Sequence, residues 1–194
     1  QKCLHSQTRI VVTKYHLGYS YPETYPQAKH VPDELLVWSK FWQKNIGNIW
    51  PASLNVYSNK YTESKMQSYR GIQRQESSVV IISQGAISNQ LSKQILDNIK
   101  KLSKYKVYYK LHPSEYGTWN GNKSLVELSM FDNFEIVEEV DLFHLFATCE
   151  YQIGVFSTAL FEGIELGCKL VIVSLPGSEY MSCIENKIDL NDFN

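Results

Sequence analysis

The stretch Val79-Val-Ile-Ile-Ser-Gln-Gly-Ala-Ile87 carries the first clear structural signal in this chain of 194 residues. Its first four residues form a continuous β-branched run, which is typical of a strand that is buried on both faces of a parallel sheet. The apolar residues that follow recur at steps of three or four, and they are Ile87, Leu91, Ile95, Ile99 and Leu102. This spacing predicts one amphipathic helix directly after the strand.

The alternation of strand and helix continues toward the end of the chain. Asp141 fits the N-cap of one later helix, and another is predicted over Thr158–Leu166, closed by Gly167. Further strands are predicted at Lys106–Leu111, Phe134–Val137, Tyr151–Val155 and Lys169–Val173. Short connections between such units predict an α/β fold, with a Rossmann-like parallel sheet and helices on both faces, over residues 76–194.

Residues 1–75 differ in composition from the rest of the chain. Aromatic side chains are crowded there, and prolines interrupt the stretch up to Pro32, so long helices are not expected before that residue. A short helix is predicted over Asp33–Lys44. The polar stretch Asn59–Ser78 is either a linker or a solvated helix. We therefore treat residues 1–75 as a separate region.

Charge and hydropathy disfavour several classes of protein. The formal net charge is −1, and the only arginines are Arg9, Arg70 and Arg74. Arginine is the side chain that most often reads phosphates and bases, so a nucleic-acid-binding surface is disfavoured. The longest apolar runs, such as Val79–Ile82, are far too short to cross a bilayer, and the sequence predicts no membrane span.

The cysteines point to a reducing compartment and away from a metal site. Cys3, Cys149, Cys168 and Cys183 contain no CxxC pair and no spacing typical of zinc ligands. We therefore expect no bound metal and a cytoplasmic protein. The chain begins at Gln1 with neither an initiator Met nor a secretion signal, so we expect a piece of a longer chain.

Polar residues collect at the points where the predicted strands end. Ser83-Gln84-Gly85-Ala86 follows the first strand and His112-Pro113-Ser114-Glu115 the second. Phe156-Ser157-Thr158 follows the fourth, and Ser174 with Pro176-Gly177 follows the fifth. In an open parallel sheet, ligands bind outside the carboxyl ends of the strands. The sequence therefore predicts a ligand site at this edge of the sheet.

Each candidate residue has more than one possible role. The hydroxyls of Ser157 and Thr158, beside the free N–H groups of a helix start, suit phosphate oxygens, but both residue types are also ordinary N-caps. His112 can donate a hydrogen bond to a phosphate, or it can be a partly buried histidine bonded to a neighbouring carbonyl. Gly85 permits a left-handed turn or the close approach of a ligand. Glu162 either reaches a ribose hydroxyl or is a solvated carboxylate.

By position, Ser83, Gln84, Gly85 and Glu162 are predicted to contact a nucleotide. This prediction rests on their placement after strands and on a helix, because the sequence contains no GxGxxG fingerprint and no P-loop lysine. It also contains no GxSxG elbow and no HExxH pair, so hydrolase and metalloprotease functions are disfavoured.

Two stretches resemble the motifs of a known group of enzymes. Lys110-Leu-His-Pro113 and Gly154-Val-Phe-Ser-Thr-Ala-Leu-Phe-Glu-Gly163 are similar, in that order, to the "HP" and "S-S/T" motifs of GT-B-fold glycosyltransferases. The resemblance is to the C-terminal, nucleotide-binding half of bacterial sialyltransferases, polysialyltransferases and teichoic-acid glycerophosphotransferases. It implies half of a GT-B fold. Residues 1–75 would be the remnant of the N-terminal domain with the interdomain crossover, and residues 76–194 the nucleotide-binding domain.

The resemblance also implies roles for three residues. His112, Ser157 and Thr158 would bind the phosphates of a nucleotide-sugar donor, with His112 as the catalytic group that stabilises the leaving phosphate. It implies no cofactor and no metal. In such families the catalytic base belongs to the N-terminal domain, most of which is missing here, so we expect donor binding rather than turnover by this piece alone.

The leading hypothesis is a nucleotide-sugar-dependent transferase of bacterial surface polysaccharide synthesis, making capsule or lipopolysaccharide. The resemblance favours a CMP- or CDP-linked donor, a glycan or lipid-linked acceptor, and peripheral association with the inner face of the membrane. A UDP-sugar epimerase-like enzyme of the same fold is one alternative. A non-catalytic α/β interaction module, with the aromatic first region as its interface, is another.

Overall fold

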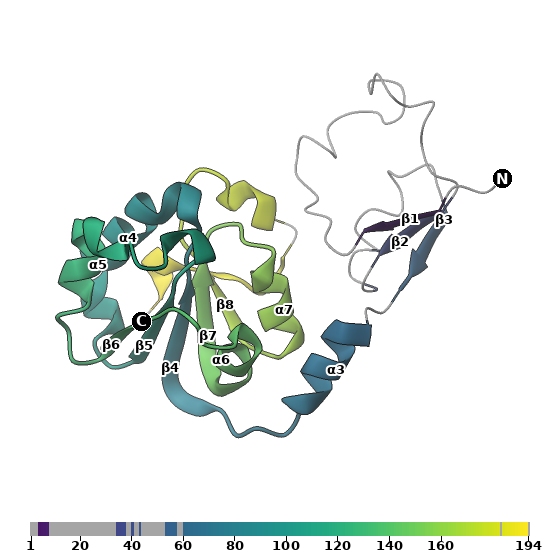
Figure 1. The fold of residues 1–194 in the computed structure, drawn as a ribbon, viewed down its shortest axis with the longest axis horizontal. Helices are drawn as coiled ribbons and strands as arrows, with labels where there is room; N and C mark the ends of the chain where they lie inside the picture. Colours follow the sequence, from purple (N-terminus) through teal and green to yellow (C-terminus); the bar gives the residue numbers. More distant parts are fainter. Residues whose placement is uncertain are drawn as a thin grey trace, which may run out of the picture. The chain divides into compact units, whose positions relative to one another are not determined.

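The structure is a computed structural model that describes residues 4–7, 34–37, 40, 43, 53–57, 60–182 and 184–193. The chain divides into two compact units, Gln1–Gln67 and Ser68–Asn194. Figure 1 shows a small sheet in the first unit and a larger sheet with helices in the second. The boundary expected after residue 75 falls at the first residue of β4, within the second unit.

The first unit contains a three-stranded parallel sheet. Its strands are β1 (Leu4–Gln7), β2 (Glu34–Val37) and β3 (Ser53–Val56), in the order β1-β2-β3. The predicted helix over Asp33–Lys44 is therefore wrong at its start. Glu34–Val37 pairs with a strand on each side, and this non-local pairing overrides the local helical pattern.

Helix α3 (Lys60–Ser68) follows β3 and carries mostly exposed side chains. It confirms the solvated-helix alternative for the first part of the polar stretch Asn59–Ser78, whereas that prediction is wrong for Gln75–Ser78, which form the start of β4. In the described part of the chain, no helix has both the length and the apolar character that crossing a bilayer requires.

The second unit is built on a six-stranded parallel sheet in the order β6-β5-β4-β7-β8-β9. The chain enters at the centre of the sheet, adds two strands on one side and then three on the other. This is the strand order of the doubly wound Rossmann fold, whose ligand sites lie where the order reverses. The strands are β4 (Gln75–Ile82), β5 (Lys106–Lys110), β6 (Phe134–Val137), β7 (Cys149–Gly154), β8 (Lys169–Ile172) and β9 (Ile188–Asp189).

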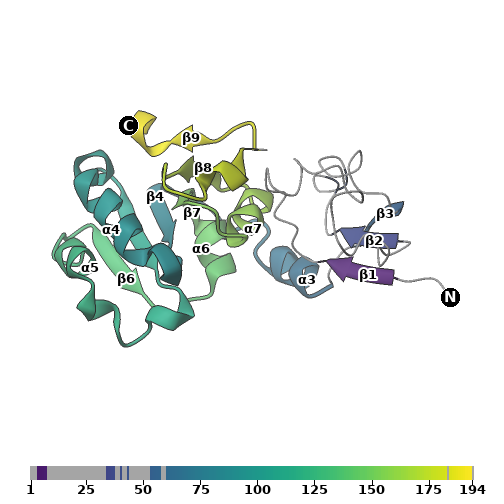
Figure 2. The same cartoon turned by 90° about the horizontal axis from the view of Figure 1, so that it is seen from above.

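Helices cover the sheet on both faces. α4 packs against α5, and α6 packs against α7; Figures 1 and 2 show the two pairs on opposite sides of the central strands. The helices are α4 (Ser88–Asp97), α5 (Lys123–Leu128), α6 (Leu142–Thr148) and α7 (Ala159–Glu165). The 3-10 turns are η2 (Gly85–Ile87), η3 (Ile99–Leu102), η4 (Pro113–Glu115), η5 (Trp119–Gly121), η6 (Ser178–Met181) and η7 (Leu190–Asp192).

The helix predicted after the first strand is confirmed at Ser88–Asp97, but it stops earlier than its apolar spacing indicates. It ends at Asn98, whose backbone N–H and side-chain amide both donate to the Gln94 carbonyl, at 3.2 Å and 2.9 Å. The chain then continues as the 3-10 turn η3. The apolar residues at 99 and 102 still face the core, so the spacing predicts burial correctly across the break.

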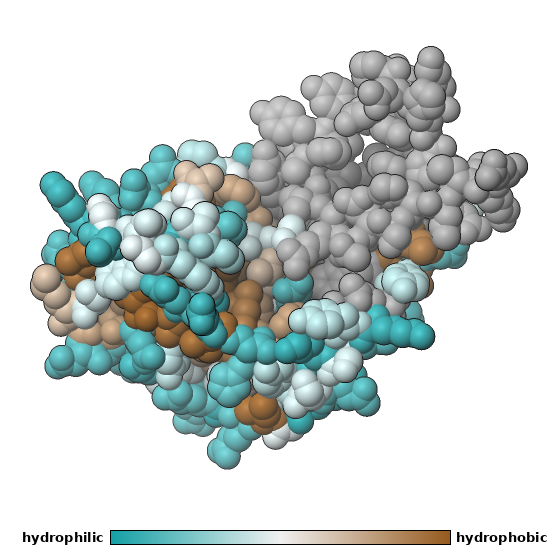
Figure 3. Space-filling model, in the orientation of Figure 1, coloured by the Kyte–Doolittle hydropathy of each residue, from teal (hydrophilic) through white to brown (hydrophobic). Residues whose placement is uncertain are grey.

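The core lies between the sheet and its helices. Val79, Val80 and Ile81 of β4 are fully buried, as the continuous β-branched run predicts. Figure 3 shows hydrophilic residues over much of the visible surface of the second unit. The parallel α/β sheet with helices on both faces agrees with the fold class predicted from the sequence.

One arginine joins three carbonyls at the amino-terminal side of this sheet. The Arg74 guanidinium donates to the carbonyls of Phe146 at 3.1 Å, Cys149 and Leu166. These carbonyls lie near the end of α6, at the start of β7 and after α7. Arg74 therefore satisfies backbone acceptors that the helix ends leave open.

A glutamine is buried between β7 and α7. Gln152 is fully buried, and its Nε2 donates to the Leu160 carbonyl at 2.9 Å. Its Oε1 has no hydrogen-bond partner within the described residues. Gly163 packs directly on this amide, because a Cβ at that position would lie 2.2 Å from Oε1.

Candidate functional site

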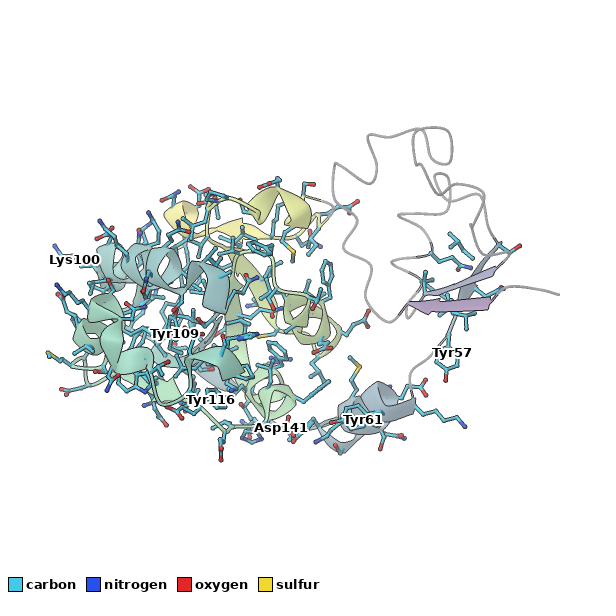
Figure 4. All side chains as sticks on the ribbon, turned by 45° about the horizontal axis from the view of Figure 1, so that its top comes forward. Tyr57, Tyr61, Lys100, Tyr109, Tyr116 and Asp141 are labelled. Atoms are coloured by element: carbon cyan, nitrogen blue, oxygen red, sulfur yellow. The ribbon has the colours of Figure 1, made fainter. Side chains whose placement is uncertain are left out.

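Ser83 directly follows β4 and lies beneath the surface rather than on it. It is 3% exposed; its N–H donates to the Lys110 carbonyl at 3.0 Å, and its hydroxyl is 3.4 Å from the Tyr109 hydroxyl. Burial raises the pKa of Tyr109 far above its ordinary value. Figure 4 shows Tyr109 among the interior side chains of the second unit. Ser83 therefore supports the loop that follows it.

Gln84 joins the two strands between which the strand order reverses. Its Oε1 accepts a hydrogen bond from the Phe156 N–H at 3.2 Å. Gln84 follows β4, and Phe156 follows β7. The loop that carries Ser157 and Thr158 is thus tied to the loop that carries Gly85, at the position where doubly wound sheets bind ligands.

Position 85 needs a glycine because a neighbouring loop packs closely on it, and not because of its backbone angles. Within the described residues, the glycines with positive φ are Gly71, Gly117, Gly167 and Gly177. The left-handed turn considered for Gly85 is therefore wrong. A Cβ at Gly85 would lie 2.4 Å from the Ser114 Oγ, so the close approach at this position is made by the loop after β5.

His112 is exposed, and its ring is held by the residue two positions later. Its Nδ1 accepts from the Ser114 N–H at 3.2 Å and lies 2.7 Å from the Ser114 Oγ. The alternative of a partly buried histidine bonded to a carbonyl is wrong, since the side chain is exposed and Nδ1 contacts Ser114. Within the described part of the chain, Nε2 has no recorded protein partner, which suits it to donate to a ligand.

Two buried charges fix the His112 loop. The Glu115 carboxylate is 8% exposed and accepts from the His112 N–H at 2.8 Å and from the Ser88 hydroxyl. Lys110, also 8% exposed, donates through Nζ to the Tyr116 hydroxyl and to the Glu138 carbonyl. Buried charges are tolerated when they are hydrogen-bonded in this way.

Ser157 and Thr158 lie directly before α7. The Ser157 hydroxyl accepts from the Ala159 N–H at 3.3 Å, so the capping role considered for it is observed. Thr158 is the N-cap and makes no side-chain cap hydrogen bond. Helix α7 is shorter than predicted, and both side chains are half-buried beside Phe156.

Glu162 lies in the first turn of α7 and is 8% exposed. The alternative of a solvated carboxylate is therefore wrong for this residue. Glu165, which lies one turn farther along the same helix, is exposed. The difference places Glu162 on the inner face of α7 and leaves a nucleotide-contacting role as a prediction.

The loop after β8 joins the loops that follow β4, β5 and β7. Gly177 has φ +100°, and a Cβ there would lie 2.3 Å from the Phe156 ring. Contacts thus run without a break from the His112 loop through Gly85 and Gln84 to Phe156 and Gly177. The carboxyl ends of β5, β4, β7 and β8 are joined in one surface, as the sequence predicts from the positions of its polar residues.

Sequence reasoning placed three further residues at the strand ends but did not predict that they hold this surface together. These are Ser114, Glu115 and Phe156, and the sequence holds a signal for two of them. His112-Pro-Ser-Glu115 has Pro at the first position of a turn and Glu at the third, which is the spacing of a capping box. Across the described residues, no group of three or more His, Cys, Asp or Glu side chains could hold a metal ion.

Comparisons with known proteins find a likeness in fold only. No protein-family model and no curated protein sequence matches the chain. UDP-GlcNAc 2-epimerase from Methanocaldococcus jannaschii has a TM-score of 0.58 and 11% identity over 96% of this chain and 58% of its own. Its complex with UDP-GlcNAc and UDP gives a TM-score of 0.52 and 12% identity, over 88% and 55%.

A GtfA/B complex gives a TM-score of 0.50 with 15% identity, over 80% of this chain and 33% of its own. The chain thus spans less than two thirds of each of these solved chains. The predicted fold class is confirmed, because the neighbours have the two-domain GT-B fold and the second unit here has the Rossmann-like form of one half.

Proposed function

We propose that this chain supplies the donor-binding part of an enzyme that acts on a nucleotide sugar. The observation that carries the proposal is the continuous surface at the reversal of strand order, where Gln84 bonds to Phe156 and His112 presents a ring nitrogen. Doubly wound sheets bind nucleotides at this position. The complex of the epimerase from M. jannaschii with UDP-GlcNAc and UDP supports a donor of that class.

In this proposal the phosphates of the donor lie between His112 and the Ser157-Thr158 pair. His112 Nε2 donates to a phosphate oxygen, and the two hydroxyls with the nearby backbone N–H groups contact the others. Gln84 and Gly85 border the phosphates, Glu162 reaches the ribose, and Ser83 supports the loop from below. No bound cofactor or metal takes part in these contacts.

The reaction proposed is transfer of the sugar to a hydroxyl of a glycan or lipid-linked acceptor. The bond between the anomeric carbon and the phosphate oxygen breaks, and its electron pair stays on that oxygen, where His112 stabilises the charge. The acceptor oxygen bonds to the anomeric carbon, and its proton passes to a base from another part of the enzyme. Surface-polysaccharide synthesis at the inner membrane face, with a CMP- or CDP-linked donor, is the finer form of this proposal.

The test is calorimetric titration of the whole chain with CMP, CDP, UDP and GDP. We expect saturable binding of one nucleotide, weakened about tenfold or more by His112→Ala, because a hydrogen bond to a charged group is lost. His144→Ala is the matched control, since His144 is an exposed histidine on α6 outside the joined loops. Equal loss in both variants, or no binding at millimolar concentration, would contradict the proposal.

A second candidate function is sugar-nucleotide epimerisation, which the likeness to the epimerase from M. jannaschii favours. Incubation with UDP-N-acetylglucosamine separates the two candidates, because an epimerase yields an altered sugar without an acceptor. Absence of all nucleotide binding would favour the interaction module instead. Tyr57 and Tyr61, which are 46% and 65% exposed, would then be candidates for its interface.

A further inference from the structure

We infer that Ser114 is a positioning residue that fixes the tautomer of His112, with the proton on Nε2 and a lone pair on Nδ1. The inference rests on the proposed function for its consequence in ligand binding. The tautomer itself is a property of the chain and can be measured without any ligand.

The backbone of Ser114 decides between the two tautomers. Its N–H can only donate, and it lies 3.2 Å from His112 Nδ1. Nδ1 must therefore present its lone pair, which in a neutral imidazole leaves the proton on Nε2. The opposite tautomer would place two N–H groups against each other at this contact.

The hydroxyl of Ser114 strengthens the same choice. Its Oγ lies 2.7 Å from Nδ1, and a hydroxyl can donate or accept. Because the adjacent N–H already requires Nδ1 to accept, the hydroxyl donates to that nitrogen as well. Two donors from one residue thus converge on one lone pair of His112.

The surrounding loops keep this arrangement in place. The His112 N–H is held by Glu115 Oε2 at 2.8 Å, so the backbone that carries the ring is fixed. Gly85 leaves the space that the Ser114 hydroxyl occupies, since a Cβ there would lie only 2.4 Å from Oγ. The glycine, the serine and the glutamate therefore act together on the orientation of one ring.

The tautomer decides whether His112 Nε2 attracts or repels an anionic oxygen of a ligand. With the proton on Nε2, the neutral ring donates to an anionic oxygen. With the proton on Nδ1, the same nitrogen would direct a lone pair at that oxygen. Ser114 therefore determines whether His112 attracts a phosphate at a pH where the imidazole is neutral.

The test is a long-range ¹H–¹⁵N correlation spectrum of the ¹⁵N-labelled chain at about pH 8, where an ordinary histidine is neutral. His112→Ala identifies the resonances of that ring. We expect the pattern of Nε2–H in the unmodified chain. In Ser114→Ala the ratio of the two tautomers should shift about fivefold toward Nδ1–H, which is the effect of one hydrogen bond.

Three further variants make the result specific. Ser114→Thr keeps the hydroxyl and should retain the original ratio. Ser129→Ala removes an exposed hydroxyl that donates to the Val126 carbonyl, and it should leave the tautomer ratio unchanged. Gly85→Ala should shift the ratio as Ser114→Ala does, and adding it to Ser114→Ala should produce little further shift, because the clashing oxygen is then absent.

The outcomes separate this inference from the proposed function. A proton on Nδ1 in the unmodified chain would overturn the inference whatever the chain binds, and an unchanged ratio in Ser114→Ala would overturn the role assigned to the Ser114 hydroxyl. The expected tautomer together with no nucleotide binding would leave the inference standing and remove the proposed function. Where a nucleotide binds, its affinity should fall in Ser114→Ala in proportion to the fraction of the Nε2–H tautomer that is lost, and return in Ser114→Thr.

Discussion

Replacing Gly163 by alanine should destabilise the second unit, although helix propensity predicts the opposite. Alanine in a helix interior is favoured over glycine by about 1 kcal/mol. In this structure, however, the new Cβ would lie 2.2 Å from Gln152 Oε1 and 2.7 Å from its Nε2. These distances are far inside van der Waals contact, so the amide must move.

The size of the effect follows from the burial of that amide. Moving the Gln152 amide breaks its 2.9 Å hydrogen bond to the Leu160 carbonyl. Because Gln152 is fully buried, water cannot replace that bond. A broken buried hydrogen bond costs about 1–3 kcal/mol, and overpacking a core costs about 1–3 kcal/mol. After subtracting the propensity gain, Gly163→Ala should lower the free energy of unfolding by about 1–5 kcal/mol.

Urea unfolding followed by circular dichroism measures this change, with amide hydrogen exchange in β7 reporting the second unit separately. The double variant Gln152→Ala/Gly163→Ala is the control. With the amide removed, Gly163→Ala should become neutral or stabilising relative to Gln152→Ala alone. A stabilising effect of Gly163→Ala in the unmodified chain would refute the close packing of Gly163 on Gln152.

Three other perturbations have expected outcomes. Arg74→Met should lower the free energy of unfolding by about 2–5 kcal/mol in urea titrations, because three carbonyls lose a charged donor. Gly177→Ala should cost about 1–3 kcal/mol in the same assay and weaken nucleotide binding, since its φ of +100° is strained for alanine and its Cβ would displace Phe156. Burial raises the pKa of Cys149 to about 11 and of Cys168 to about 12. The unfolded thiols ionise near pH ~8.5, so the unfolded chain loses protons that the folded chain keeps. Stability should therefore fall as pH rises above about 9, less steeply in Cys168→Ala.

The sequence predicts the sheet of the second unit because each strand there carries its own signal. Val79–Ile82 is apolar at every position, and only a strand covered on both faces needs that pattern. The same strands end in polar residues, so the amino-acid order alone predicts the common edge of Ser83-Gln84-Gly85, His112 and Ser157. Parallel strands with helical crossovers place those ends together.

The remaining features depend on contacts between distant residues. Glu34–Val37 forms a strand because it has a partner on each side. The burial of Glu162 and the contact of Gly85 with Ser114 likewise arise from packing between separate elements. Local periodicity carries no information about such neighbours. The Pro-Ser-Glu spacing after His112 is the exception, since a capping box is a local pattern.

The strand order of the second unit also has a consequence for how the chain folds. Val79 lies opposite Val107 on one side and opposite Tyr151 on the other. The chain between β4 and β7 is longer than that between β4 and β5, so bringing β7 to β4 costs more conformational entropy. We therefore expect β4, β5 and β6 to pair first and β7 to join later. During synthesis from the amino terminus, β4 exposes an unpaired apolar edge until β7 has left the ribosome. The chain is most prone to aggregation during that interval. The candidate site forms only when β7 has paired with β4.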